Sequence, residues 1–109
     1  MAVESRDARA AKNEAIYREV NERVMEVAEK FEAEGLEALC ECSDAGCTGT
    51  LSITMTEYAL VRSRGSRFAL IPGHEDPRIE RVVEHNERFL VVEKIGEAGE
   101  VAEELNPRE

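Results

Sequence analysis

The sequence predicts an α+β fold in which a long N-terminal helix precedes a small, zinc-stabilised antiparallel sheet with one short helix. Three observations lead to this prediction. Residues 6–34 contain neither glycine nor proline, apolar and polar residues alternate after Gly35, and three cysteines lie within residues 40–47. A chain of 109 residues has room for one compact domain and not for two. We divide the chain into an N-terminal helical arm (1–35), a small zinc-binding α+β domain (36–95) and an acidic tail (96–109).

The chain is strongly acidic. It carries 24 Asp and Glu against 14 Lys and Arg, a net charge of −10 at pH 7, which disfavours binding to DNA, RNA or anionic lipid. No stretch approaches the roughly 20 apolar residues of a membrane-spanning helix. The N-terminus is polar from its first residues and lacks a signal-peptide pattern. We therefore expect a cytoplasmic protein with no membrane association and with reduced thiols.

Five apolar residues at helical spacing predict the N-terminal helix. They are Ile16, Val20, Val24, Val27 and Phe31, separated by four, four, three and four positions. Gly35 is placed to end this helix, which would be about 40 Å long at 1.5 Å per residue. Because the remaining domain is too small to cover that length, we expect Ile16, Val20 and Val24 to face a second copy of the chain or a protein partner. The alternative is a frayed N-terminus and a shorter helix that the sheet covers fully.

Alternating apolar residues predict short strands after Gly35. We place strands at 36–42, 50–55, 68–71, 79–84 and 88–94. Thr56 is expected to cap a short helix at 57–62, and the acidic tail can form a turn or two of helix at 100–105. A helix over 78–85 is the alternative to the strand there. We favour the strand because β-branched pairs flank a polar turn.

The cysteines of residues 40–47 predict a zinc site. Cys40 and Cys42 project to the same side of an extended chain, and the turn after them can return Cys47 as a third ligand. Two other interpretations remain open. The cysteines can be small apolar core residues, or Cys42 and Cys47 can form a labile disulfide.

The fourth ligand has two histidine candidates. His74 follows a Pro-Gly turn that can swing its ring toward the cysteines, and Glu75 and Asp76 stand beside it as acceptors for the other ring nitrogen. His85 lies in a polar turn, where an exposed histidine is common. We therefore assign Cys40, Cys42, Cys47 and His74 as the metal ligands, with one zinc per chain. Asp44, Glu41 or water remain as alternatives for the fourth position.

The order of the motifs resembles a family of small acidic bacterial proteins without an established activity. The matching segments are 13–24, 39–42, 46–47, 51–58, Pro72-Gly-His-Glu75 and 90–94, which together cover about residues 10–104. The most distinctive marks are the Cys-x-Cys-x4-Cys run and the downstream Pro-Gly-His-Glu. The resemblance supports pairing His74 with the cysteines, and it implies no particular reaction.

We expect the zinc to be structural and the chain to act as a protein-interaction or regulatory module rather than as an enzyme. Three thiolates and one imidazole complete a tetrahedral shell and leave no position for water or substrate. Two alternatives are a thiol redox sensor, in which oxidation of Cys42 and Cys47 ejects zinc, and a small metalloenzyme with an open zinc position and Glu41 or Glu75 as base. The arginines of residues 62–67 are expected in a solvated loop, with an anion or RNA contact as the alternative.

Overall fold

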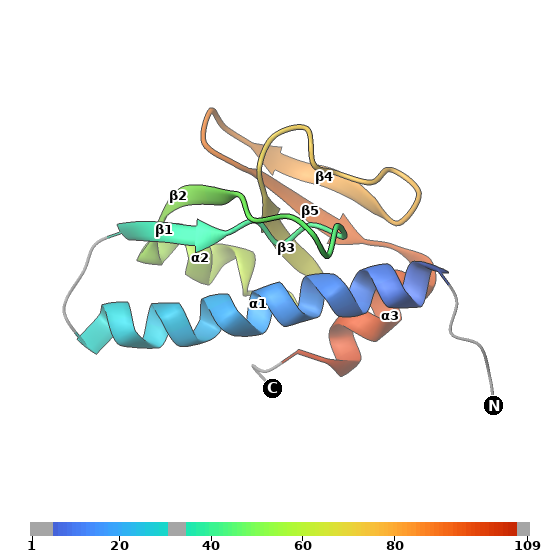
Figure 1. Cartoon of the computed structure of the whole chain (residues 1–109), viewed down its shortest axis with the longest axis horizontal. Coiled ribbons are helices and arrows are strands. Elements are labelled where there is room, and N and C mark those ends of the chain that lie inside the picture. The colour runs from blue at the N-terminus through green and yellow to red at the C-terminus, as the bar shows by residue number, and fades with distance from the viewer. Residues whose placement is uncertain (1–5, 31–34, 107–109) are drawn as a thin grey trace.

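Helix α1 (Arg6–Lys30) is the first element of the computed structural model, which describes residues 6–30 and 35–106. The elements that follow are β1 (Gly35–Leu39), β2 (Thr50–Thr54), α2 (Met55–Val61), β3 (Arg67–Leu70), β4 (Glu80–His85), β5 (Leu90–Lys94) and α3 (Gly96–Glu104). The long helix, the antiparallel sheets and the short helices confirm the predicted α+β class (Figure 1). None of the described helices combines the length and the apolar character that crossing a bilayer requires.

The strands form two antiparallel sheets where the sequence suggested one. Strands β1 and β2 pair as a hairpin, and the second sheet has the order β3-β5-β4. Strand β1 ends at Leu39, three residues before the end of the predicted strand 36–42. Glu41 then donates its backbone N–H to the carbonyl of Ala69 in β3, which links the two sheets. The hairpin predicted from residues 79–94 is confirmed, with a bulge between Val82 and Glu84, so the helical alternative at 78–85 is wrong.

Two residues predicted to end or begin a helix have other roles in the structure. Gly35, expected to end the N-terminal helix, is the first residue of β1 and pairs with Thr54. Thr54 also caps α2, because its side chain accepts from the Glu57 N–H while the Glu57 carboxylate accepts from the Thr54 N–H. The predicted cap, Thr56, lies inside this helix.

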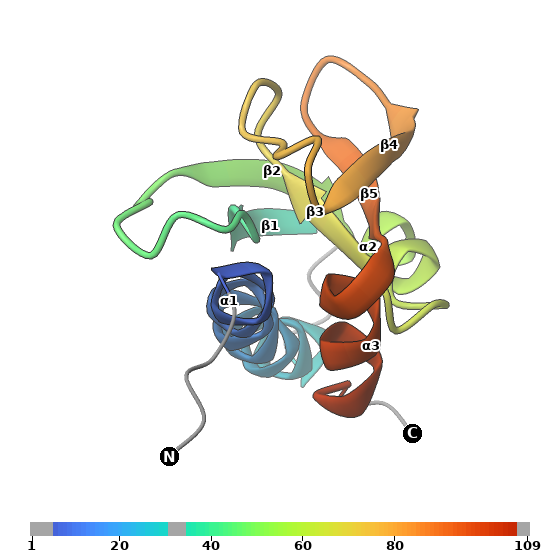
Figure 2. The same ribbon diagram turned by 90° about the vertical axis from the view of Figure 1, so that its right-hand side faces the viewer.

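Helix α1 forms one layer of the molecule and the two sheets lie over it. It runs along the longest dimension, 46 Å, beneath β1, β2 and the three-stranded sheet (Figure 1). A view along its axis shows α3 beside it (Figure 2). The acidic tail thus supplies a complete helix of nine residues, Gly96–Glu104, and this helix covers part of α1 that the sequence left without a partner.

The face of α1 that packs on the protein is the opposite of the predicted apolar stripe. The side chains of Ile16, Val20 and Val27 are 60%, 40% and 54% exposed, Val24 is half-buried, and Phe31 lies outside the described residues. The buried residues of α1 are Ala11, Glu14, Ala15, Arg18, Asn21 and Met25. Residues two positions apart point in nearly opposite directions on a helix with 3.6 residues per turn. Ile16 therefore faces solvent because Arg18 faces the core.

Arg18 can be buried because the fold gives its guanidinium specific partners. The group donates to the carbonyl oxygens of Gly65 and Ala102 and lies 4.4 Å from the centre of the Phe68 ring. Burial lowers the pKa of Arg18 to about 10, which leaves it charged at neutral pH. A charged residue thus joins α1 to α3 and to β3.

A second buried cluster joins α1 to the three-stranded sheet. The Lys94 ammonium contacts the carboxylates of both Glu14 and Glu80, and all three side chains are inaccessible to solvent or nearly so. One ammonium balances only one carboxylate, and burial raises the pKa of Glu80 to about 7. Burial also lowers the pKa of Lys94 to about 6, so the interior favours the states of the cluster that carry little charge.

We expect Lys94→Met to destabilise the protein by about 3–5 kcal/mol, because it leaves two buried acidic side chains without the amine that contacts both. Arg81→Met is the matched control, since Arg81 forms an exposed ion pair with Glu93 in the same sheet. Its loss should cost at most about 1 kcal/mol. Urea unfolding of the two variants measures both values. Equal losses for the two would show that the buried cluster contributes no more than a surface pair.

Candidate metal centre

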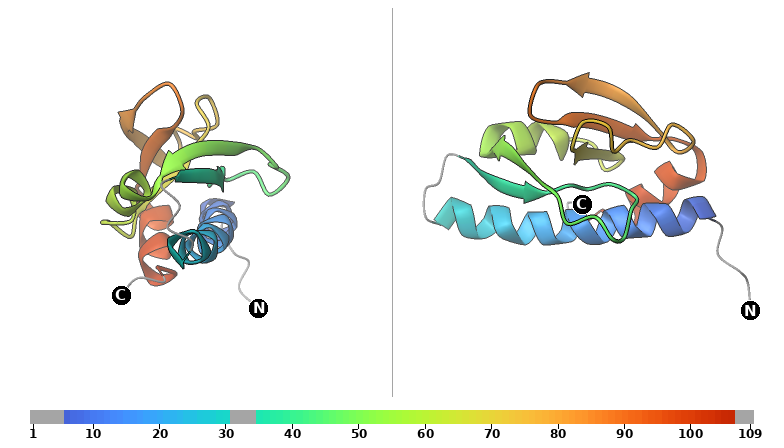
Figure 3. Two further views of the ribbon diagram at one scale, coloured as in Figure 1. Left: turned by 90° about the vertical axis from the view of Figure 1, so that its left-hand side faces the viewer. Right: turned by 45° about the horizontal axis from the view of Figure 1, so that its top comes forward.

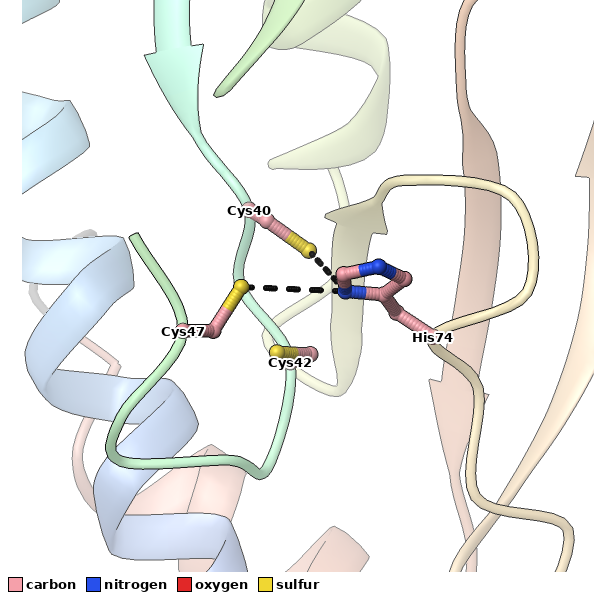
Figure 4. A group of neighbouring side chains, drawn as sticks. All are labelled: Cys40, Cys42, Cys47 and His74. Atoms are coloured by element: carbon pink, nitrogen blue, oxygen red, sulfur yellow. Dashed lines mark hydrogen bonds between the residues drawn. The ribbon is translucent and has the colours of Figure 1, made fainter. Parts of the chain in front are cut away.

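Two loops bring the four predicted ligands together. The segment 40–49 between β1 and β2, which we call the cysteine loop, carries Cys40, Cys42 and Cys47. His74 comes from the connection between β3 and β4. The three sulfur atoms and the imidazole converge on one point between these loops (Figure 4).

The distances between the side chains fit a tetrahedral metal site. The ligand atoms of Cys40, Cys42, Cys47 and His74 all lie within 4.8 Å of one another. His74 Nδ1 is 3.6 Å from the Cys40 sulfur and 3.7 Å from the Cys47 sulfur. Zn–S bonds of about 2.3 Å and a Zn–N bond of about 2.1 Å place sulfur and nitrogen about 3.6 Å apart in a tetrahedron. The site therefore has the dimensions of a Cys3His metal centre.

Local turns fix the shape of both loops. The cysteine loop is closed by the Cys40 N–H, which donates to the Gly49 carbonyl at 3.0 Å. At its tip, the Asp44 carboxylate accepts from the Gly46 N–H at 2.8 Å, and the Asp44 carbonyl accepts from the Cys47 N–H at 3.0 Å.

The histidine loop makes a tight turn that directs the ring toward the sulfurs. The His74 N–H donates to the Ile71 carbonyl at 3.0 Å, and Gly73 adopts φ of +94°. That left-handed conformation strains most residues with a Cβ, so glycine suits this position. The turn after Pro72 thus directs the His74 ring toward the cysteines, as the sequence predicted.

Backbone amides donate to two of the sulfurs. The Ile71 N–H lies 3.2 Å from the Cys40 sulfur, and the Asp44 N–H donates to the Cys42 sulfur. Burial raises the pKa of both thiols, and these two amides lower it. Without a metal the two cysteines therefore hold their protons, and a metal ion must displace them when it binds.

Glu41 lies just after the end of β1, between Cys40 and Cys42, and its side chain makes other contacts than the two cysteines do. Its carboxylate is fully buried and accepts hydrogen bonds from Asn21 Nδ2, the Tyr58 hydroxyl and the Ala69 N–H at 2.8, 2.6 and 3.0 Å. Sequence reasoning offered Glu41 as a ligand or a base, and the structure instead makes it an anchor for the Cys-Glu-Cys segment. A single acid between two cysteines gave no signal of this role.

Helix α1 supplies a set of outer contacts that sequence reasoning missed. The Tyr17 hydroxyl lies 3.0, 2.7 and 3.1 Å from the carbonyl oxygens of Asp44, Ala45 and Cys47. The cysteine loop crosses α1 at this point (Figure 3). The available signal was the spacing of Asn13, Tyr17 and Asn21, four positions apart on one side of the apolar stripe.

The structure separates the competing interpretations of the predicted residues. All three cysteines are free, so the disulfide between Cys42 and Cys47 is not formed. Cys40 and Cys42 are buried in an apolar cluster with Phe68, which agrees with part of the core interpretation. Cys47 is half-buried and His74 is exposed. His85 lies at the end of β4, outside the cluster of metal-ligating atoms found among the described residues.

We expect His74→Ala to weaken zinc binding at least about tenfold, because one ligand is lost and a position opens to water. His85→Ala is the matched control, since both histidines are exposed. It should leave the affinity unchanged. Competition with a chromophoric chelator measures the two affinities. The reverse order, or no change in either variant, would contradict the assignment of His74.

No family model matches this chain, and no curated protein or solved structure is similar enough to be matched with it.

Proposed function

We propose that this chain is a zinc-binding protein in which the metal is structural. The observation that carries the proposal is the 3.6 and 3.7 Å separation of His74 Nδ1 from the sulfurs of Cys40 and Cys47. Those separations match the distance between a nitrogen and a sulfur ligand of tetrahedral zinc.

The chemistry of the ligand set favours zinc among biological metals. Three thiolates select soft or borderline ions, and one imidazole with tetrahedral geometry is typical of structural zinc. Calcium and magnesium prefer oxygen ligands in larger shells. Neutral imidazole and three thiolates around Zn²⁺ leave a net charge of −1, which the two N–H donors to Cys40 and Cys42 help to offset.

A structural role follows from what the metal would join. The ligands come from two loops that belong to different sheets, and four protein ligands fill a tetrahedral shell. The apolar clusters of the described residues are small. A small domain gains stability from such a cross-link, because metal binding contributes directly to the free energy of folding.

The purified protein should carry close to one zinc per chain when no chelator is used, as measured by elemental analysis. Cys47→Ser should lose the metal and weaken the β1–β2 hairpin, while the helical signal in circular dichroism largely remains. Thr48→Ser is the control, since it changes the neighbouring exposed residue and should keep full zinc content. Fresh, reduced protein with no transition metal and three freely titratable thiols would refute the proposed function.

We propose further that α1 provides the interaction surface and that a second copy of the chain occupies it. Ile16, which is 60% exposed, lines two neighbouring hollows, one of about 260 Å³ that includes Leu105 and one of about 90 Å³ that includes Ala45. A ridge beside a hollow on one surface suits a two-fold dimer, in which each copy inserts its ridge into the hollow of the other. The exposed Val20 and Val27 extend the same apolar surface along α1.

Sedimentation at micromolar concentration should show a dimer that Val20→Glu converts to a monomer, because the new charge would be buried in the interface. Val82→Glu is the matched control. Val82 lies on β4 and is 41% exposed, against 40% for Val20, and its replacement should leave the dimer intact. A wild-type monomer would exclude the second copy as the partner of α1.

A further inference from the structure

Three polar residues of α1 follow the backbone around the cysteine loop. Asn13, Tyr17 and Asn21 are four positions apart, so they lie on successive turns of the helix. We call them the polar row.

Each residue of the polar row contacts a different part of the chain around the metal ligands. Asn13 Nδ2 lies 3.4 Å from the Ser43 carbonyl, and the Tyr17 hydroxyl lies among three carbonyls at the loop tip. The Asn21 amide accepts from the Leu39 N–H at 2.8 Å and donates to the Leu39 carbonyl at 2.9 Å. It therefore holds the residue that directly precedes the first ligand, Cys40.

These contacts depend on the shape of the loop rather than on its side chains. With the exception of the Glu41 carboxylate, every partner of the polar row is a backbone group. The three carbonyls near Tyr17 belong to Asp44, Ala45 and Cys47, and they converge only while the loop keeps its turn. A metal ion that binds Cys42 and Cys47 fixes both ends of this turn.

The apolar packing of the N-terminal half of α1 is confined to small residues, chiefly Ala11 against Ile79 and Ala98. Its buried apolar residues are the small Ala11 and Ala15, and its larger buried residues are Glu14 and Arg18. Hydrogen bonds and ion pairs require specific geometry, whereas apolar packing tolerates small displacements. This part of α1 is therefore more sensitive to the position of its partners than an apolar helix would be.

We propose that metal occupancy of the cysteine loop controls the docking of the N-terminal half of α1. With metal bound, the polar row holds α1 against the loop. When the metal is removed, the turn at 42–47 loosens, and residues 9–21 keep only their contacts with α3, β1 and the three-stranded sheet, so this part of α1 opens more often. The inference rests on the proposed function, because it requires that the four ligands hold zinc.

Thermodynamic linkage gives this inference a second, independent consequence. If zinc strengthens the docking of α1 by some factor, then docking strengthens zinc binding by the same factor. A variant that weakens docking only in the zinc-bound state, without touching a ligand, must therefore lower the affinity for zinc. Tyr17→Phe is such a variant, since it removes a single hydroxyl group.

Amide hydrogen exchange on the full chain tests the inference. It is measured on the zinc-loaded protein and on protein treated with a chelator and a reductant. Amides of residues 9–21 should exchange at least about tenfold faster without zinc, while those of the β3-β5-β4 sheet change little. Zinc-loaded Tyr17→Phe should show part of the same increase, together with an equal fold-loss in zinc affinity. Glu19→Gln, on the exposed side of α1, should show neither effect.

The outcomes separate this inference from the proposed function. A chain that binds no zinc overturns the proposed function and removes the basis of the inference. Zinc bound at one per chain with equal exchange of residues 9–21 in both states overturns the inference alone. If chelation unfolds the whole chain, the zinc affinity of Tyr17→Phe decides, and an affinity equal to that of the wild type overturns the inference.

Discussion

The Glu41 carboxylate is the point on which both the fold and the candidate metal centre depend. It accepts from Asn21 of α1, from Tyr58 of α2 and from the Ala69 N–H of β3, so a single side chain joins three elements. Burial raises the pKa of Glu41, whereas these three donors lower it. Because Glu41 lies between Cys40 and Cys42, the hydrogen bonds to its carboxylate also hold the backbone that carries both cysteines.

The elements that could be predicted from the sequence are those in which local pattern and tertiary packing agree. Apolar residues alternate with polar ones in β2 and form a continuous run in β5, and both patterns are typical of strands. The convergence of His74 on the cysteines was predictable for a similar reason. A Pro-Gly turn has few conformations, and three clustered cysteines leave few places for a fourth ligand.

The buried face of α1 could not be predicted, because its charged residues have partners far away in the sequence. Glu14 contacts Lys94, and Arg18 donates to carbonyls of Gly65 and Ala102. Amphipathic patterning assumes that apolar residues face inward, and here Ile16 and Val20 face solvent instead. The full extent of α3 was missed for a related reason: its small buried residues, Ala98 and Ala102, carry a weak apolar signal.

The buried carboxyl of Glu80 couples folding to the pH of the solution. Its carboxyl has an ordinary pKa of 4.5, which burial raises to about 7 in the folded chain. Between these two values the folded chain holds a proton that the unfolded chain has released, so folding takes up a proton. The contribution of Glu80 to the free energy of unfolding therefore falls as the pH rises through this interval. For a chain with 24 acidic residues, Glu80 by itself works against the usual trend, in which native acids resist protonation and mild acid weakens the fold. Lys94, whose pKa burial lowers to about 6, has the opposite effect above that pH, because there the folded chain has released a proton that the unfolded chain still holds.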